Sequence, residues 1–179
     1  MNNEFEVQFI RRLGSLEKGE LAVLKRNAGL KLDESIGVLP IFYKIYYPSK
    51  EAGIDYYENA CFLVSTLYGH NKYYESSIDF GKTLRKIKSL KGSSSIDNRV
   101  SVLLNSSFDS YTGDGDFPYR LTQLVKMANG SGIGIDWIML LYDIRNWSHP
   151  SKFVQKKWSK SYFSENYKDD TNNLSDSEI

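Results

Sequence analysis

The stretch IDWIMLLYDIRNW, residues 135–147, decides the fold class of this chain. Its apolar side chains recur every three or four residues, which is the spacing of a helix that buries one face. These side chains are Trp137, Leu140, Leu141, Ile144 and Trp147. Asp136 stands directly before them, at a position where an aspartate side chain caps a helix N-terminus. The stretch therefore predicts a capped helix with a tryptophan-rich buried face.

The same helical spacing continues on both sides of this stretch. It predicts further helices over about residues 4–14, 16–28, 38–47, 55–69, 80–90, 95–104, 118–128 and 150–163. Asp55 and Asp79 stand at N-cap positions, and Pro150 stands where a proline opens a helix. No segment alternates apolar and polar residues between hairpin turns, so no strand is expected. We therefore predict an all-α fold, a compact bundle of about eight or nine short helices.

The domain organisation follows from length and composition. A chain of 179 residues fits one domain, and 41% hydrophobic with 14% aromatic residues is too apolar for a disordered chain. We expect residues 1–163 to form one helical domain, which the Ser-rich break at 92–95 would allow to divide into two small subdomains. Residues 164–179 hold five acids and one base and have no hydrophobic period. This segment is predicted to be a disordered acidic tail.

The folded part is basic although the whole chain is nearly neutral. The whole chain has 23 Lys and Arg against 22 Asp and Glu, which gives a formal net charge of +1. The tail alone contributes −4, so the remaining residues carry a net charge of +5. The bases gather at 18–31, 82–91 and 152–160, and their helices lack acids at i±4 spacing. The pattern predicts stripes of unpaired bases, which repel one another unless a polyanion meets them. The alternative is an ordinary solubilising surface.

Few residues offer catalytic or metal-binding chemistry. A single cysteine excludes an internal disulfide and a cysteine-based zinc site, and Cys61 lies in an apolar helical stretch where a buried, inert thiol is expected. His70 and His149 stand at predicted helix ends, where polar side chains cap helices or face solvent. The acids of residues 105–118 lack the EF-hand spacing, so a solvated loop is expected. We predict a protein that is not an enzyme and needs no cofactor or metal.

Membrane association is not expected either. The longest apolar stretches, such as 60–64 and 137–142, are far too short to span a bilayer. The first residues lack the basic and apolar regions of a secretory signal. We therefore expect a cytoplasmic protein.

An ordered set of segments resembles a known family. The segments are GELAVLKR at 19–26, DFGKTLRK at 79–86, RLTQLV at 120–125, the stretch 135–147, and VQKKWSKSYF at 154–163. Together they resemble the CasB family, the small subunit of the type I-E CRISPR surveillance complex called Cascade. The resemblance covers residues 5–163. Lys25 stands where the family pattern has arginine, and Ile78 where it has glycine.

The resemblance implies an all-α, non-catalytic protein that works inside a complex. Two copies of such a subunit sit head to tail along Cascade, against a backbone of CRISPR-RNA-binding subunits. They help to hold the target strand paired with the guide RNA and to guide the displaced strand, while a separate helicase-nuclease cuts the DNA. The implied partners are the other Cascade subunits, the guide RNA, the target DNA and a second copy of the chain.

Bases within the matched segments are the predicted phosphate contacts. They are Lys25, Arg26, Lys82, Arg85, Lys86, Arg99, Arg145, Lys156, Lys157 and Lys160. Such contacts do not read sequence but stabilise an R-loop, whose formation is a nearly balanced exchange of duplexes. Arg145 has the alternative of pairing with a neighbouring carboxylate, and Asp143 is expected to be a satisfied buried acid. The alternative function is a helical protein-protein scaffold without direct nucleic-acid binding.

Overall fold

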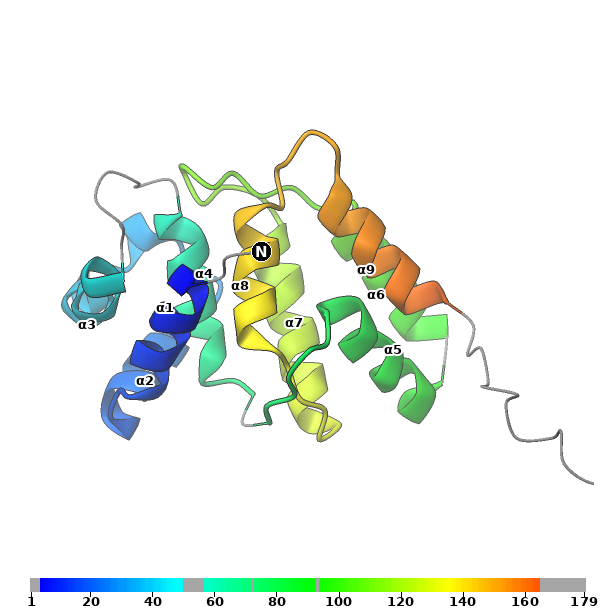
Figure 1. The fold of residues 1–179 in the computed structure, drawn as a ribbon, viewed down its shortest axis with the longest axis horizontal. Helices are drawn as coiled ribbons and strands as arrows, with labels where there is room; N and C mark the ends of the chain where they lie inside the picture. Colours follow the sequence, from blue (N-terminus) through cyan, green and yellow to red (C-terminus); the bar gives the residue numbers. More distant parts are fainter. Residues whose placement is uncertain (1–3, 50–56, 72, 93, 165–179) are drawn as a thin grey trace, which may run out of the picture.

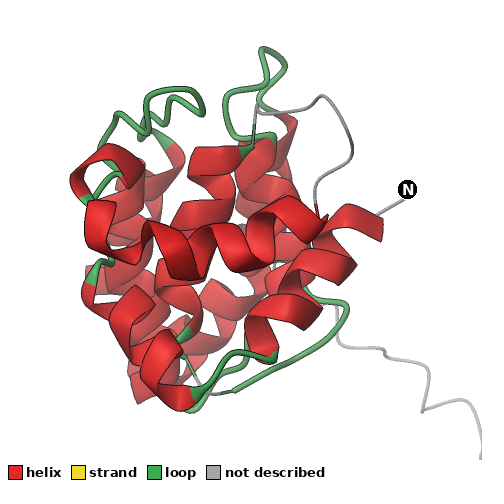
Figure 2. Cartoon of the chain, turned by 90° about the vertical axis from the view of Figure 1, so that its left-hand side faces the viewer, coloured by secondary structure: helices red, strands yellow, loops and turns green. Residues whose placement is uncertain are grey.

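The computed structural model describes residues 4–49, 57–71, 73–92 and 94–164. These ranges form α1 (Glu4–Gly14), α2 (Lys18–Arg26), α3 (Leu39–Tyr46), α4 (Glu58–Tyr68), α5 (Phe80–Lys91), α6 (Ser94–Leu104), α7 (Phe117–Gly130), α8 (Trp137–Arg145) and α9 (Phe153–Phe163), with short 3-10 turns at Leu32–Glu34, Ile36–Val38 and Tyr47–Ser49. The only β pairing within them is an isolated parallel bridge between Tyr74 and Ile135. The predicted all-α class is confirmed, and Figure 2 shows helices joined by loops.

The helices form two groups on either side of a central pair (Figure 1). The first group, α1 to α4, contacts the central helix α8 through α1 and α4, and the second, α5, α6 and α9, contacts the central helix α7 through α5 and α6. One hydrophobic core extends from Phe9 to Tyr162. The helices before and after the Ser-rich break, α5 and α6, contact each other and both contact α7 and α9. The break therefore lies inside the second group of helices.

Two helix starts are capped as the sequence predicts. The Asp79 carboxylate accepts a hydrogen bond from the Lys82 backbone N–H at 2.9 Å. The Asp136 carboxylate accepts from Ile138 N at 3.1 Å and Met139 N at 3.0 Å. Each cap satisfies backbone donors that a helix N-terminus leaves without an intrahelical partner. The third predicted cap, Asp55, lies outside the described residues.

The predicted start of the last helix at Pro150 is wrong. The helix α9 begins at Phe153, because a turn occupies the preceding residues. Lys152 has a left-handed backbone conformation with φ of 53°, and its N–H donates to the His149 carbonyl at 2.9 Å. A left-handed residue cannot continue a right-handed helix, so the helix starts after it. The φ angle of Pro150, which would suit the first turn of a helix, therefore does not decide where α9 begins.

An aromatic cluster forms the core between α7 and α9. The rings of Trp147 and Trp158 lie 5.1 Å apart, and Phe117 lies 4.1 Å from Trp147. Trp147 follows the end of α8 and lies in the next turn, where its indole N–H donates to the Ser106 carbonyl at 3.1 Å. Both tryptophans are at most 1% exposed. Trp147 of the fold-deciding stretch and Trp158 of α9 therefore act in packing.

Candidate nucleic-acid interface

The helices α5 and α9 meet backbone against backbone at Gly81. A Cβ atom at this position would lie 2.3 Å from the Trp158 carbonyl oxygen. The Ser161 hydroxyl donates to the Asp79 carboxylate at 2.5 Å, which ties α9 to the N-terminus of α5. Predicted site residues that stand far apart in the sequence therefore lie on two helices in direct contact.

Both helices bury their apolar sides and leave lysines outside. The exposed lysines from the predicted set are Lys82 and Lys86 on α5 and Lys156 and Lys160 on α9; we call these four residues the α5/α9 face. The spacing of each pair is four residues, which places the two lysines of a pair on one side of their helix. Within the described part of the chain, the ammonium groups of Lys82, Lys156 and Lys160 have no hydrogen-bond or ion-pair partner. These charges are available to an anion.

Other bases of α5 have acidic or polar partners. Lys86 forms an ion pair with Glu75, and Lys88 lies 2.9 Å from Asp97. Arg85 is half-buried and donates to the Ser164 hydroxyl at 2.6 Å. The expectation of unpaired bases is wrong for Lys86 and Lys88, because each acid comes from another element and not from an i±4 position. Such surface pairs are worth less than about 1 kcal/mol, so a phosphate competes with them at little cost.

Lys157 differs from the α5/α9 face because its partner is a buried acid. Its ammonium group pairs with Asp143, whose side chain is fully buried, and the Trp158 indole N–H donates to the second carboxylate oxygen at 2.6 Å. Burial raises the pKa of Asp143, and the ion pair with Lys157 opposes that rise. The prediction of a satisfied buried acid is confirmed. Because its ammonium group is already paired, Lys157 attracts a phosphate less than an unpaired lysine does.

Arg145 likewise contacts a buried acid. It pairs with Glu6 of α1, a residue that is 2% exposed, and its guanidinium lies 3.6 Å from the centre of the Tyr57 ring. Arg145 does pair with a carboxylate, but the partner comes from the far end of the chain and not from a neighbouring residue as predicted. The arginine joins α8 to α1 inside the molecule.

The remaining predicted contacts lie on other helices. Lys25 and Arg26 are exposed in the last turn of α2, which belongs to the first group of helices (Figure 1). Arg99 is exposed on α6 in the second group, where it lines a groove together with residues of α7. The predicted site residues therefore do not form one surface.

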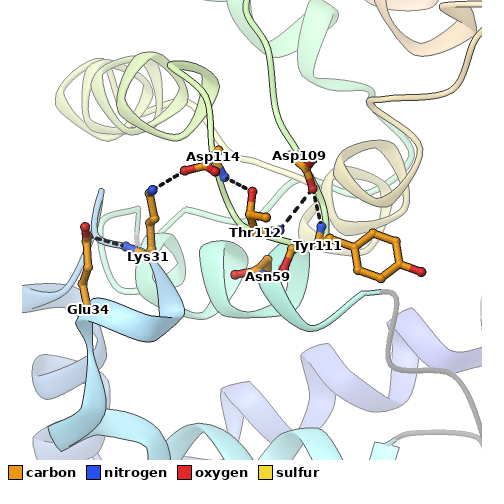
Figure 3. A network of polar contacts seen from close by, with 7 residues as sticks. All are labelled: Lys31, Glu34, Asn59, Asp109, Tyr111, Thr112 and Asp114. Atoms are coloured by element: carbon orange, nitrogen blue, oxygen red, sulfur yellow. Dashed lines mark hydrogen bonds and ion pairs between the residues drawn. The ribbon is translucent and has the colours of Figure 1, made fainter.

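The acids of the loop 105–116 are used in local structure (Figure 3). The Asp109 carboxylate accepts from Tyr111 N at 2.7 Å and Thr112 N at 3.1 Å, and Asp114 pairs with Lys31. Asp116 accepts from Ser107 N at 3.0 Å.

Across the described ranges, no three His, Cys, Asp or Glu side chains gather to hold a metal ion. In the same ranges, no helix has the length and apolar character needed to cross a membrane.

Sequence reasoning missed two kinds of residue. The acids Glu6, Glu75 and Asp97 pair with bases from other elements, and nothing in local spacing indicates those pairs. Tyr119 and Gln123 line the groove beside Arg99, and their i,i+4 spacing on an amphipathic helix could have placed them on one face.

Comparison with known proteins identifies the family. The family described as CRISPR-associated protein Cse2 matches residues 20–163. A CRISPR-associated protein Cse2 of Thermus thermophilus is 30% identical over 106 residues, which span 58% of this chain and 56% of that protein. The crystal structure of M. ruber CasB superposes with a TM-score of 0.72 at 22% identity, covering 89% of this chain and 92% of the other.

A chain in a structure named "CRISPR RNA-guided surveillance complex" has the same fold, with a TM-score of 0.69 at 19% identity over 89% of this chain and 92% of the other. The family match covers four fifths of the sequence, including all of α5, α6 and α9. It confirms the resemblance to CasB proteins that the ordered segments indicated. This chain belongs to the CRISPR-associated protein Cse2 family.

Proposed function

We propose that this chain is the small, non-catalytic subunit of a type I-E CRISPR surveillance complex, Cascade. In this role it binds the target and displaced DNA strands through basic surfaces and stabilises the R-loop. Its partners are the other subunits, the guide RNA and a second copy of itself, arranged head to tail. The named surveillance complex, which contains a chain of this fold, supports this assembly.

The α5/α9 face is the observation that carries the binding part of the proposal. Three of its four lysines have no side-chain partner in the described structure, and both helices belong to the matched region. Lysine rows on adjoining helices suit a phosphate backbone, because they neutralise charge without reading bases. R-loop formation is a nearly balanced exchange, so a few backbone contacts shift it.

The decisive experiment measures R-loop lifetime with the complete reconstituted complex. The variant Lys156→Glu/Lys160→Glu reverses two exposed charges of α9 and is expected to shorten the lifetime by tenfold or more at about 0.15 M salt. It should also reduce the salt slope of DNA binding by roughly 1.4–1.8, since each lost phosphate contact removes about 0.7–0.9.

A matched control separates the surface from total charge. The variant Arg11→Glu/Lys126→Glu makes the same charge change at exposed positions of α1 and α7 outside the predicted set. Arg11, like Lys160, lies in the last turn of its helix, so both variants place an acid near a helix C-terminus. Equal R-loop lifetimes for the two variants would reject the α5/α9 face as a DNA contact and favour the scaffold function.

Assembly is tested separately by purification from the native host. A tagged copy of the chain should bring down CRISPR subunits together with a guide RNA of uniform length. Native mass measurement of that complex should count two copies of the chain. Recovery of the chain without guide RNA would contradict membership of the complex.

A further inference from the structure

A polar groove lies on the surface formed by α6 and α7. It has a volume of about 290 Å³ and is lined by Arg99, Tyr119, Arg120, Gln123 and Leu124. Of this set, only Arg99 is among the phosphate contacts predicted from the sequence. One wall of the groove, α6, contacts both helices that carry the α5/α9 face.

Two guanidinium groups give the groove an affinity for anions. Arg99 is exposed and has no side-chain hydrogen bond or ion pair within the described part of the chain. Arg120 donates its Nε–H to Asp116 at 2.6 Å. A guanidinium carries five N–H donors, so this contact leaves others for a second acceptor. With two arginines against one nearby carboxylate, the groove retains positive charge.

An aromatic ring and an amide complete the lining. Tyr119 is 64% exposed in the first turn of α7, so one of the largest exposed aromatic surfaces of the chain lies beside the two arginines. Gln123 follows four residues later, on the same side of the helix. An amide both donates and accepts hydrogen bonds, as the edge of a nucleobase does.

We propose that this groove binds an unpaired nucleotide of single-stranded nucleic acid. Tyr119 stacks on the base, Arg99 and Arg120 hold the adjacent phosphates, and the Gln123 amide contacts the base edge. Proteins that hold single strands without sequence preference combine these elements, a basic groove and an aromatic stacking surface. The proposal rests on the proposed function, since that function requires the chain to bind a displaced single strand.

The test compares two oligonucleotides with equal phosphate numbers on the full-length chain. One is oligo-dT of about 15 nucleotides, and the other replaces every base by an abasic site. Stacking should make the chain bind oligo-dT roughly 5- to 100-fold more tightly than the abasic strand. Tyr119→Ala should remove this preference and leave abasic binding unchanged, whereas Tyr119→Phe should retain it. Arg99→Met should weaken both strands equally.

The controls keep failure of the groove distinct from failure of the proposed function. Tyr74→Ala removes a tyrosine of similar exposure, 60%, from another segment and should change neither affinity. If Tyr119→Ala binds oligo-dT as the unaltered chain does, the groove proposal is overturned, while weaker binding by Lys156→Glu/Lys160→Glu still upholds the α5/α9 face. If no variant alters binding of either strand, both proposals fail. A parallel titration with oligo-rU should give the same dependence on Tyr119, because stacking does not read the sugar.

Discussion

Asp143 illustrates how one buried acid fixes two other residues. Its carboxylate pairs with Lys157 through one oxygen and accepts from the Trp158 indole N–H through the other. Asp143 and the Trp158 side chain are fully buried, whereas Lys157 is one third exposed. Removing one partner of such a group leaves the others desolvated and unsatisfied, which costs more than the pair itself contributes.

We predict that Asp143→Ala lowers the free energy of unfolding by about 3 kcal/mol. Asp143→Asn should cost less, because an amide oxygen still accepts the Trp158 indole N–H. Denaturant unfolding with both variants measures the difference. Adding Lys157→Met to Asp143→Ala should recover part of the loss, since it removes the unpaired ammonium group. Equal losses for the alanine and asparagine variants would show that the indole hydrogen bond contributes nothing.

The packing of α5 against α9 also depends on a single residue, Gly81, because there is no room for a side chain at this position. Because an added Cβ would lie 2.3 Å from a backbone oxygen of α9, no side-chain rotation can relieve the clash. We predict that Gly81→Ala destabilises the chain by about 2–4 kcal/mol and separates α5 from α9. Thermal unfolding measures the loss of stability.

Gly19 is the matched control for this substitution. It also lies in a helix, α2, but nothing lies within 4 Å of an added Cβ. Gly19→Ala should therefore stabilise the chain by about 0.5–1 kcal/mol, the usual gain of alanine over glycine in a helix. Similar effects of the two substitutions would contradict the close approach of α5 and α9.

At the scale of elements, acids tie helices to loops and to one another. Hydrogen bonds from Tyr162 and Lys88 lower the pKa of Asp97 on α6 below its ordinary 3.8. Lys31 lowers the pKa of Asp114 in the same direction, and Arg120 lowers that of Asp116. The folded state then binds fewer protons than the unfolded chain. The resulting stabilisation is complete above about pH 4 and disappears as pH falls through the lowered values.

We predict that the melting temperature falls as the pH drops below about 4, and that Asp97→Asn makes this fall shallower. Asp143 contributes with the opposite sign, because burial raises its pKa and acid then relieves a buried charge. Melting curves between neutral pH and about pH 3 compare Asp97→Asn with the unaltered chain. Parallel curves for Asp97→Asn and the unaltered chain would show that this carboxylate does not stabilise the fold.

A helix boundary can be predicted from sequence when the interaction that fixes it joins residues close together in the chain. The caps at Asp79 and Asp136 bond within three residues, so spacing alone predicts them. The start of α9 depends on the turn around Lys152, whose left-handed conformation no periodic pattern indicates. The helical class follows from the 3.6-residue period, whereas helix boundaries follow from local turn geometry.

Across the whole molecule, sequence found the basic residues but not their partners. Lys86, Lys157 and Arg145 were predicted together with Lys156 and Lys160, yet the first three pair with acids. The partners stand 11, 14 and 139 residues away along the chain. Only packing brings such residues together, so a charge pattern along one helix cannot separate a surface lysine from a buried ion pair.

The two exposed basic surfaces, on α2 and on the α5/α9 face, belong to different helix groups (Figure 1). We predict that a strand of about 30 nucleotides contacts both, whereas one of about 6 reaches only one. Lys25→Glu/Arg26→Glu combined with Lys156→Glu/Lys160→Glu should then reduce the salt slope additively for the long strand. Filter binding at several salt concentrations measures the slopes. A long-strand slope unaffected by the α2 changes would exclude α2 from the path of the strand.

The contact between Glu6 and Arg145 has a consequence for how the chain is made. The two residues are 139 positions apart, and a ribosome adds about 5–20 residues per second, so α1 waits roughly 7–28 s for α8. During that time α1 can pack against α3, which it also contacts, but the part of its surface that faces α8 has no cover. The first helix therefore completes its packing only when the eighth has left the ribosome, however early α1 itself forms.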